Sequence, residues 1–270
     1  MHRVEIPEDL NGVLAEAWAA ARGVPGFLLE AEARFLGMAA ACTPGKGAIV
    51  EIGSFKGKST VMVARVARHY GLGLVVAIDP HTFNNPELEA HRTTPEASSF
   101  EEFLSNLARA GVADQVDVRR DFSANEMRGW SAPIRLLWID GDHSWHGAKA
   151  DFDGFLPHVI PGGVVVLHDA LHAFAGPIRV FVEQMLRSAS FGAAGFVGSI
   201  AWSQFRPEDG AAFAAQRARV ERQAARLIPY TADDGRLHGL KKLAYKLNRS
   251  RVRRAALPPA EWAARMDGAR

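Results

Sequence analysis

The stretch AIVEIGSFKGKST, residues 48–60, decides the fold prediction. Its first residues are mostly apolar and β-branched, which is typical of a strand buried on both faces of a parallel sheet. Two glycines, Gly53 and Gly57, follow this strand, and Ser59 opens a helical pattern that extends to His69. A turn between a strand and a helix presents backbone N–H groups to a ligand. The stretch therefore predicts a strand, a ligand-binding turn and a helix in succession.

Short apolar runs that end in an acid or a glycine recur along the chain. They are residues 74–80 (LVVAIDP), 134–142 (IRLLWIDGD) and 162–169 (GGVVVLHD), with a more polar strand expected at 116–121. Helical patterns between them cover residues 59–69, 100–109 and 148–158. Strands that alternate with helices at this spacing predict an α/β fold with a doubly wound, mostly parallel sheet and right-handed crossovers.

Further elements are expected on both sides of this alternation. They are helices at 7–21, 27–42, 177–188 and 211–227, and a strand at 196–205 that closes the sheet. The polar stretch 84–97 contains two prolines and fits a mobile loop over a site. We therefore predict three parts: an N-terminal helical cap (1–45), a ligand-binding domain (46–206) and a helical, basic C-terminal extension (207–270).

Three known ligand-binding patterns compete for the turn between Gly53 and Gly57. A phosphate-binding P-loop needs four residues between its glycines before Gly-Lys-Ser/Thr, whereas only three intervene here. The dinucleotide fingerprint G-x-G-x-x-G would place its second glycine at Phe55, so it also fails. The pattern E-x-G-x-x-x-G-x-S fits at every position from Glu51 to Ser59.

That third pattern resembles the first motif of the class I methyltransferases, which use S-adenosylmethionine. The resemblance implies a Rossmann-like fold whose loop glycines let the backbone approach the cofactor. It implies that Asp79 accepts hydrogen bonds from the ribose hydroxyls, that Glu51 receives the methionine ammonium group, and that residues 121–123 bind adenine. The implied cofactor-binding set is Glu51, Gly53, Ser54, Gly57, Ser59, Asp79, Asp121, Phe122, Ser123 and Asp140.

A second motif, DGDH at 140–143, ends a predicted strand, and the next strand ends in His168 and Asp169. Residues 48–170 resemble small-molecule O-methyltransferases, including antibiotic-sugar enzymes and, more distantly, catechol and caffeoyl-CoA enzymes; cephalosporin hydroxylase-like proteins share the pattern. Many members hold a magnesium-type cation, which implies the ligands Asp140, His168 and Asp169 here. Because His168 replaces the usual acid and imidazole suits manganese, iron or zinc better than magnesium, three interpretations stay open. The site binds a metal other than magnesium, or His168 contacts the ligands without binding the metal itself, or no metal binds.

Methyl transfer to a hydroxyl needs removal of its proton. A metal can lower the hydroxyl pKa, and a nearby base can take the proton. Catechol-type enzymes use a lysine three residues after the first metal-binding acid, and His143 stands at that position here. An unperturbed imidazole pKa of about 6.5 suits a base at neutral pH. The resemblance thus implies that His143 and Asp140 form the catalytic pair, with His146 as the reserve candidate.

The overall composition excludes several classes of protein. The chain has 270 residues, of which 48% are hydrophobic and 23% charged, and this balance is typical of a globular protein. Its lone cysteine, Cys42, excludes an internal disulfide framework and a cysteine zinc site. No apolar run reaches the ~18 residues of a membrane span, and the start MHRVEIPEDL lacks the apolar core of a signal peptide. We therefore expect a cytoplasmic protein.

The charge of the chain is unevenly distributed. Residues 241–254 carry seven Lys or Arg and no acid, so the rest is net acidic although the formal net charge is +2. Apolar residues at helical spacing from Leu240 to Leu247 predict an amphipathic helix here. A nucleic-acid, anionic-membrane or acidic-partner role is one interpretation. We favour a solvated helix that packs against a second subunit, and so expect a homo-oligomer such as a dimer. We expect no nucleic-acid partner, since Tyr245 is the only aromatic residue in the stretch.

These patterns lead to one main hypothesis and two rivals. The main hypothesis is an S-adenosylmethionine-dependent O-methyltransferase with a divalent cation (Mg²⁺ or Mn²⁺) and a small-molecule acceptor, for which the resemblance suggests a sugar or glycoside. The first rival is a metal-dependent, hydroxylase-like protein on the same fold, with an iron site from His143, His168 and Asp169. The second is a non-catalytic binding module that uses the basic tail. The complete loop from Glu51 to Ser59 argues against the first rival.

Overall fold

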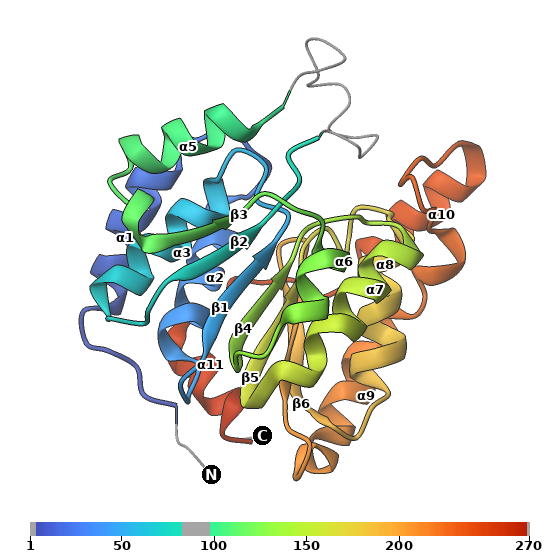
Figure 1. The fold of residues 1–270 in the computed structure, drawn as a ribbon. Coiled ribbons are helices and arrows are strands. Elements are labelled where there is room, and N and C mark those ends of the chain that lie inside the picture. Colours follow the sequence, from blue (N-terminus) through green and yellow to red (C-terminus); the bar gives the residue numbers. More distant parts are fainter. Residues whose placement is uncertain (1–3, 83–97, 269–270) are drawn as a thin grey trace.

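Seven strands form one sheet in the computed structural model, which describes residues 4–82 and 98–268 (Figure 1). The strands are β1 Ala48–Ile52, β2 Val75–Ile78, β3 Val116–Arg119, β4 Ile134–Ile139, β5 Val159–Leu167, β6 Phe191–Val197 and β7 Ile200–Phe205. Their order across the sheet is β3-β2-β1-β4-β5-β7-β6. The first five strands pair in parallel, and β7 runs antiparallel to both β5 and β6. The predicted doubly wound, mostly parallel α/β fold is confirmed.

Helices cover both faces of the sheet (Figure 1). The α-helices are α1 Leu10–Ala21, α2 Glu30–Cys42, α3 Lys58–His69, α5 Phe100–Arg109, α6 Ser123–Glu126, α7 Trp145–Phe155, α8 Ala175–Arg179, α9 Ala214–Ala224, α10 Gly239–Arg249 and α11 Pro259–Met266. Shorter turns are η1 Ala113–Gln115, η2 Met127–Gly129, η3 Leu156–His158, η5 Gly210–Phe213 and η6 Ile228–Tyr230, and η4 Val180–Leu186 is a π-helix.

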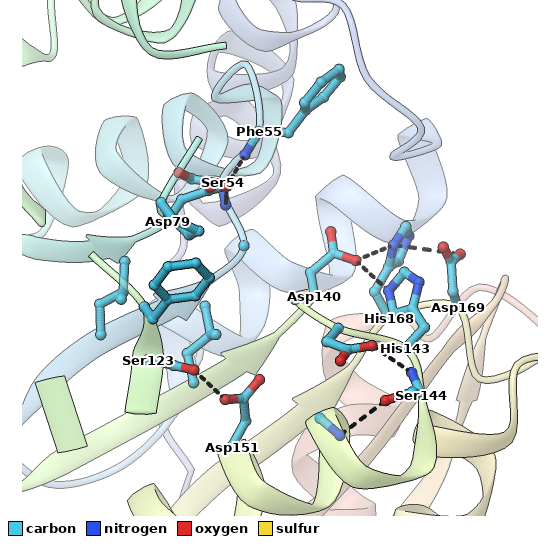
Figure 2. Close-up of a pocket in the computed structure, with 18 of the residues that line it drawn as sticks. Ser54, Phe55, Asp79, Ser123, Asp140, His143, Ser144, Asp151, His168 and Asp169 are labelled. Atoms are coloured by element: carbon cyan, nitrogen blue, oxygen red, sulfur yellow. Dashed lines mark hydrogen bonds and ion pairs between the residues drawn. The ribbon is translucent and has the colours of Figure 1, made fainter. Parts of the chain in front are cut away.

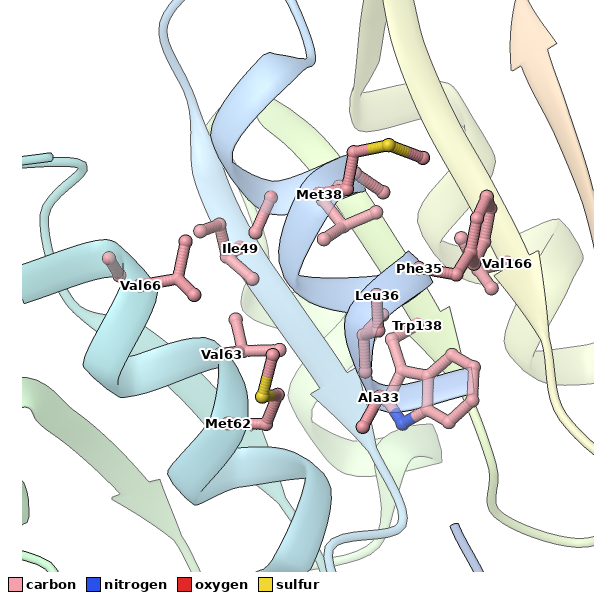
Figure 3. Packing of buried hydrophobic residues seen from close by; sticks show 14 of the residues in the cluster. Ala33, Phe35, Leu36, Met38, Ile49, Met62, Val63, Val66, Trp138 and Val166 are labelled. Carbon is pink, nitrogen blue, oxygen red and sulfur yellow. The ribbon is translucent and has the colours of Figure 1, made fainter. Parts of the chain in front are cut away.

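Strand β4 shows why the central strands have almost no polar residues. Leu136 and Trp138 belong to the hydrophobic cluster under α1, α2, α3 and α11, whereas Leu137 and Ile139 belong to the cluster under α7, α8 and α9. Figure 3 shows the first cluster, in which residues of α2 and α3 pack on β1, β4 and β5. Successive side chains of a strand point to opposite faces, so a strand covered on both faces is apolar at nearly every position, with Arg135 as the exception in β4.

The terminal segments join this same core. Phe35 of α2 packs against Trp202 of β7 and Trp262 of α11, with ring centroids 5.7 and 5.6 Å apart. The chain therefore brings α11 back to the N-terminal helices. The predicted division of the chain into three parts, with boundaries after residues 45 and 206, stays a prediction. Among the residues that the structure describes, no helix combines the length and the apolar character that a membrane span needs.

Three predicted elements differ most from the structure. The helix predicted at 211–227 is the turn η5 followed by α9, which ends at Ala224. The single closing strand at 196–205 is wrong: it is a hairpin of β6 and β7, because Gly198 adopts a positive φ of 60° and reverses the chain. The helix predicted at 177–188 is α8 followed by the π-helix η4. The predicted mobile loop at 84–97 lies outside the described residues. The helix predicted at 100–109 coincides with α5.

Candidate cofactor and catalytic site

A cavity of about 650 Å³ lies where β1, β2 and β4 end. Parallel strands of an open α/β sheet place ligands at their carboxyl ends. The predicted residues that line this cavity are Gly53, Ser54, Ser59, Asp79, Phe122, Ser123, Asp140, His143, His168 and Asp169. Three predicted residues, Glu51, Gly57 and Asp121, lie outside its lining. Residues of the glycine loop and of the DGDH motif at 140–143 thus line the same cavity.

The glycine loop turns tightly against the end of β4. Gly53 has a φ of +85°, and a Cβ there would lie 2.3 Å from the backbone oxygen of Asp140. Gly57 has a φ of +90°, and a Cβ there would lie 3.0 Å from the Phe103 ring. Only glycine adopts such angles without strain. Both glycines are required by the shape of the turn, and Gly53 also by its close contact with β4.

Asp79 organises this loop from the end of β2. Its Oδ2 accepts hydrogen bonds from the backbone amides of Ser54 (2.8 Å) and Phe55 (2.7 Å). Its Oδ1 accepts the amide of His81 at 2.6 Å. A carboxylate has about four acceptor positions, so Asp79 retains capacity for a ligand hydroxyl in the cavity that it lines. Figure 2 shows Asp79 beside Ser54 and Phe55.

Glu51 lies behind the loop. Its buried carboxylate accepts hydrogen bonds from Ser59 Oγ and from Thr60 Oγ1, the latter at 2.5 Å. Burial raises the pKa of Glu51 to about 7. The carboxylate thus fixes the first turn of α3 to β1, and its expected contact with a methionine ammonium group stays a prediction.

At the other end of the cavity, Phe122 presents a half-exposed ring and Ser123 donates a hydrogen bond to Asp151. Burial raises the pKa of Asp151 to about 6. Asp121 instead accepts the amide of Phe122 and the side-chain amide of Asn125, both at 2.7 Å. The sequence reasoning missed Asp151, although an acid on the apolar face of the predicted helix that also buries Phe152 was a signal.

Four titratable side chains meet at the ends of β4 and β5 (Figure 2). His168 Nδ1 lies 2.9 Å from Asp140 Oδ1 and 3.4 Å from Asp169 Oδ1. His143 Nε2 lies 3.3 Å from the same Asp140 oxygen. Although burial opposes it, the adjacent Asp140 and Asp169 carboxylates raise the pKa of His168 well above its usual value, and His168 in turn lowers the pKa of the buried Asp169 carboxyl. The predicted catalytic and metal-binding residues are therefore all brought together.

Among the described residues, one group has the spacing of a metal site. Asp140, His143 and Asp169 each offer one ligand atom, and these atoms lie within 4.8 Å of one another. Two carboxylates and one imidazole fit a divalent cation, with Mn²⁺ more suitable than Mg²⁺. The sequence assigned His168, rather than His143, to this group. The structure places the second ring nitrogen of His168, Nε2, 3.8 Å from Glu32 Oε2, behind the carboxylates.

Segments outside the central motifs complete the site. Residues 25–28 line the cavity beside the loop, where Lys58 Nζ donates to the backbone oxygen of Gly26 at 3.0 Å. Asp233, after α9, also lines the cavity and accepts the amide of Trp145 at 2.9 Å. Sequence reasoning missed these contributions. Contacts between segments this far apart have no local pattern, although the Gly-Val-Pro-Gly turn at 23–26 marked a bend there.

Glu32, on α2, connects that helix to this site. It is buried and accepts the Ser199 amide at 2.6 Å and the Leu29 amide at 2.9 Å. Its hydrogen bonds and the neighbouring His168 lower its pKa to about 2, against the opposing effect of burial. The buried carboxylate thus connects α2, the β6–β7 turn and the imidazole behind the carboxylate pair.

Comparisons with known proteins agree with this geometry. A family model described as a methyltransferase domain matches residues 50–170. Similar solved structures are cofactor-bound Rv0187 from MTB (24% identity, TM-score 0.51), the O-methyltransferase from Bacillus cereus in complex with SAH (22%, 0.50) and the O-methyltransferase TomG from Streptomyces achromogenes, involved in tomaymycin synthesis, in complex with SAM (20%, 0.51). Each comparison covers 75% of this chain and 92% of the other. Likeness at these identities shows the fold. Residues 50–170 of the chain thus resemble a methyltransferase domain, within a fold that solved O-methyltransferases share.

Proposed function

We propose that this protein transfers a methyl group from S-adenosylmethionine to a hydroxyl of a small molecule, with a sugar or glycoside as the favoured acceptor. One observation carries the proposal: a single cavity contains the glycine loop with Asp79 and the cluster of Asp140, His143 and Asp169. Transfer between two bound substrates needs such a shared space, because alignment of the reacting atoms supplies much of the rate. The O-methyltransferases among the similar structures support oxygen as the acceptor atom.

The loop side of the cavity is the proposed cofactor half. Asp79 has remaining acceptor capacity for a ribose hydroxyl, a group to which a carboxylate hydrogen-bonds strongly. Phe122 offers an exposed ring face for the adenine, and the nearby Asp151 carboxyl offers a hydrogen-bond partner for its edge. Bound S-adenosylmethionine would supply an electrophilic methyl group. The protein therefore needs only to position the cofactor, and no covalent intermediate with the protein is required.

The acidic side is the proposed acceptor half. We assign proton removal to His143, because Asp140 lies 3.3 Å from its Nε2 and can orient the ring and stabilise its protonated form. Asp140 and Asp169 are the proposed carboxylate ligands of a divalent cation, which would lower the pKa of an acceptor hydroxyl. His168 packs behind both carboxylates and positions them.

Methyl transfer measured with labelled S-adenosylmethionine tests this proposal. We expect methylation of hydroxyl acceptors that a chelator abolishes and Mn²⁺ restores. His143→Ala should reduce turnover about 100-fold or more and leave cofactor affinity nearly unchanged. His158→Ala, on η3 and away from the cavity, is the matched control and should retain full turnover.

Each part of the proposal can fail separately. Transfer to amines but to no hydroxyl acceptor would overturn the reaction type. Full activity in the presence of chelator would overturn the cation. Wild-type turnover in His143→Ala would remove His143 from the role of base, and a selective loss in His146→Ala would transfer that role to His146.

A further inference from the structure

Helix α10 carries a stripe of exposed leucines. Leu240, Leu243 and Leu247 are 84%, 65% and 54% exposed. Their spacing of three and four residues places them on one face of the helix. Single exposed apolar residues are normal on protein surfaces, whereas a contiguous apolar stripe marks a surface with a partner.

The opposite face of α10 is held against the domain. Tyr245 is buried, and its hydroxyl oxygen accepts the backbone amide of Ala173 at 2.7 Å. Lys241 Nζ donates to the backbone oxygen of Thr231 at 2.8 Å. These contacts fix the rotation of the helix about its axis, so the leucine stripe faces outward. Figure 1 shows α10 at the periphery of the molecule, beyond α8.

Cations surround the stripe. Lys242 and Lys246 are exposed on α10 itself, and Arg251, Arg253 and Arg254 follow it. No acidic residue lies between 240 and 254. An exposed apolar stripe on a helix whose own residues and the segment after it carry cations and no acid is complementary to an anionic surface with an apolar interior.

We propose that α10 docks on an anionic lipid surface. The leucines would enter the boundary between headgroups and acyl chains while the lysines and arginines remain at the lipid phosphates. A second copy of the chain fits less well. The three leucines offer on the order of 400 Å², against about 800 Å² per partner in a standard interface. Two copies of this basic helix would also repel each other.

The docked helix lies close to the site in the chain. Asp234 lines the cavity, and only a short turn separates it from the start of α10. Ala173, which anchors Tyr245, lies near Asp169 in the turn after β5. Docking through α10 therefore would hold the cavity near the lipid surface.

Co-sedimentation of the full chain with lipid vesicles tests this inference. We expect binding to vesicles of phosphatidylcholine mixed with phosphatidylglycerol, weak binding to phosphatidylcholine alone, and weakening by salt. The double variant Leu243→Gln/Leu247→Gln should bind at least about tenfold more weakly. Leu74→Gln removes a leucine that is 52% exposed before β2 and is the matched control. Because all three leucines are exposed, we expect both variants to fold.

Four results would overturn the inference. Equal binding to neutral and anionic vesicles would remove the role of the cations. Wild-type binding by the double variant would remove the role of the stripe. A wild-type dimer that the double variant converts to a monomer in light scattering would identify a second copy of the chain as the occupant, and binding of nucleic acid in place of vesicles would identify that partner.

Discussion

Glu51 shows how one buried carboxylate shapes both the loop and the stability of the protein. Burial raises its pKa from 4.5 to about 7, and nearby Asp140 and Asp79 add to the effect. The folded state thus holds the proton more tightly than the unfolded state does. The resulting contribution to stability is complete below about pH 4.5 and is lost as the pH rises through about 7.

The substitution Glu51→Gln removes this titration. We expect the variant to gain stability relative to wild type between pH 5 and pH 8, by up to about 3 kcal/mol. Urea denaturation at several pH values measures the difference, with the exposed Glu16→Gln as control. Parallel pH profiles for Glu51→Gln and wild type would contradict the account.

At the scale of elements, the loop between β1 and α3 depends on one close contact. A Cβ at Gly53 would lie 2.3 Å from the backbone oxygen of Asp140 and would need a φ of +85°. We expect Gly53→Ala to lower stability by about 1–3 kcal/mol and to abolish cofactor binding, because the loop must move away from β4. Gly129→Ala is the control, since a Cβ there meets nothing within 4 Å. Unchanged cofactor affinity in Gly53→Ala would show that the loop does not form the cofactor site.

The elements also show which parts of the fold the sequence could predict. Strands with apolar residues on both faces, such as β4, stand out because every position is buried. The hairpin of β6 and β7 was hidden, because both strands are buried and only Gly198 and Ser199 separate them, which leaves little room for a turn signal. Asp121 and Asp151 show a similar limit. The sequence singled out Asp121 from its position after β3, whereas the packing of α7 brings Asp151 to the cavity lining.

At the scale of the whole molecule, the ends of the chain complete both the core and the cavity. Residues 25–28 and Asp233 line the cavity, although both lie outside residues 50–170, the segment that matches the methyltransferase-domain model. Motifs within that segment predicted both the glycine loop and the cluster of Asp140, His143 and Asp169. Residues 25–28 and Asp233 reach the cavity only in the folded chain, so sequence patterns alone could not assign them.

Trp262 tests this dependence on the C-terminal segment. Its side chain is fully buried between Phe35 and Trp202. We expect Trp262→Ala to lower the free energy of unfolding by about 3–5 kcal/mol, because the cavity left behind adds to the lost burial. Chemical denaturation checks this value against Trp18→Ala, which removes a partly exposed ring and should cost less. A loss below about 1 kcal/mol would show that α11 is not part of the core.

Titration calorimetry with S-adenosylmethionine tests the central claim most directly. We predict saturable binding to the wild type, at least about tenfold weaker binding to Asp79→Asn, and nearly wild-type binding to His143→Ala. That pattern would place the cofactor on the loop and Asp79, with His143 on the acceptor side. Absence of binding at millimolar cofactor, or equal affinity in wild type and Asp79→Asn, would contradict the account.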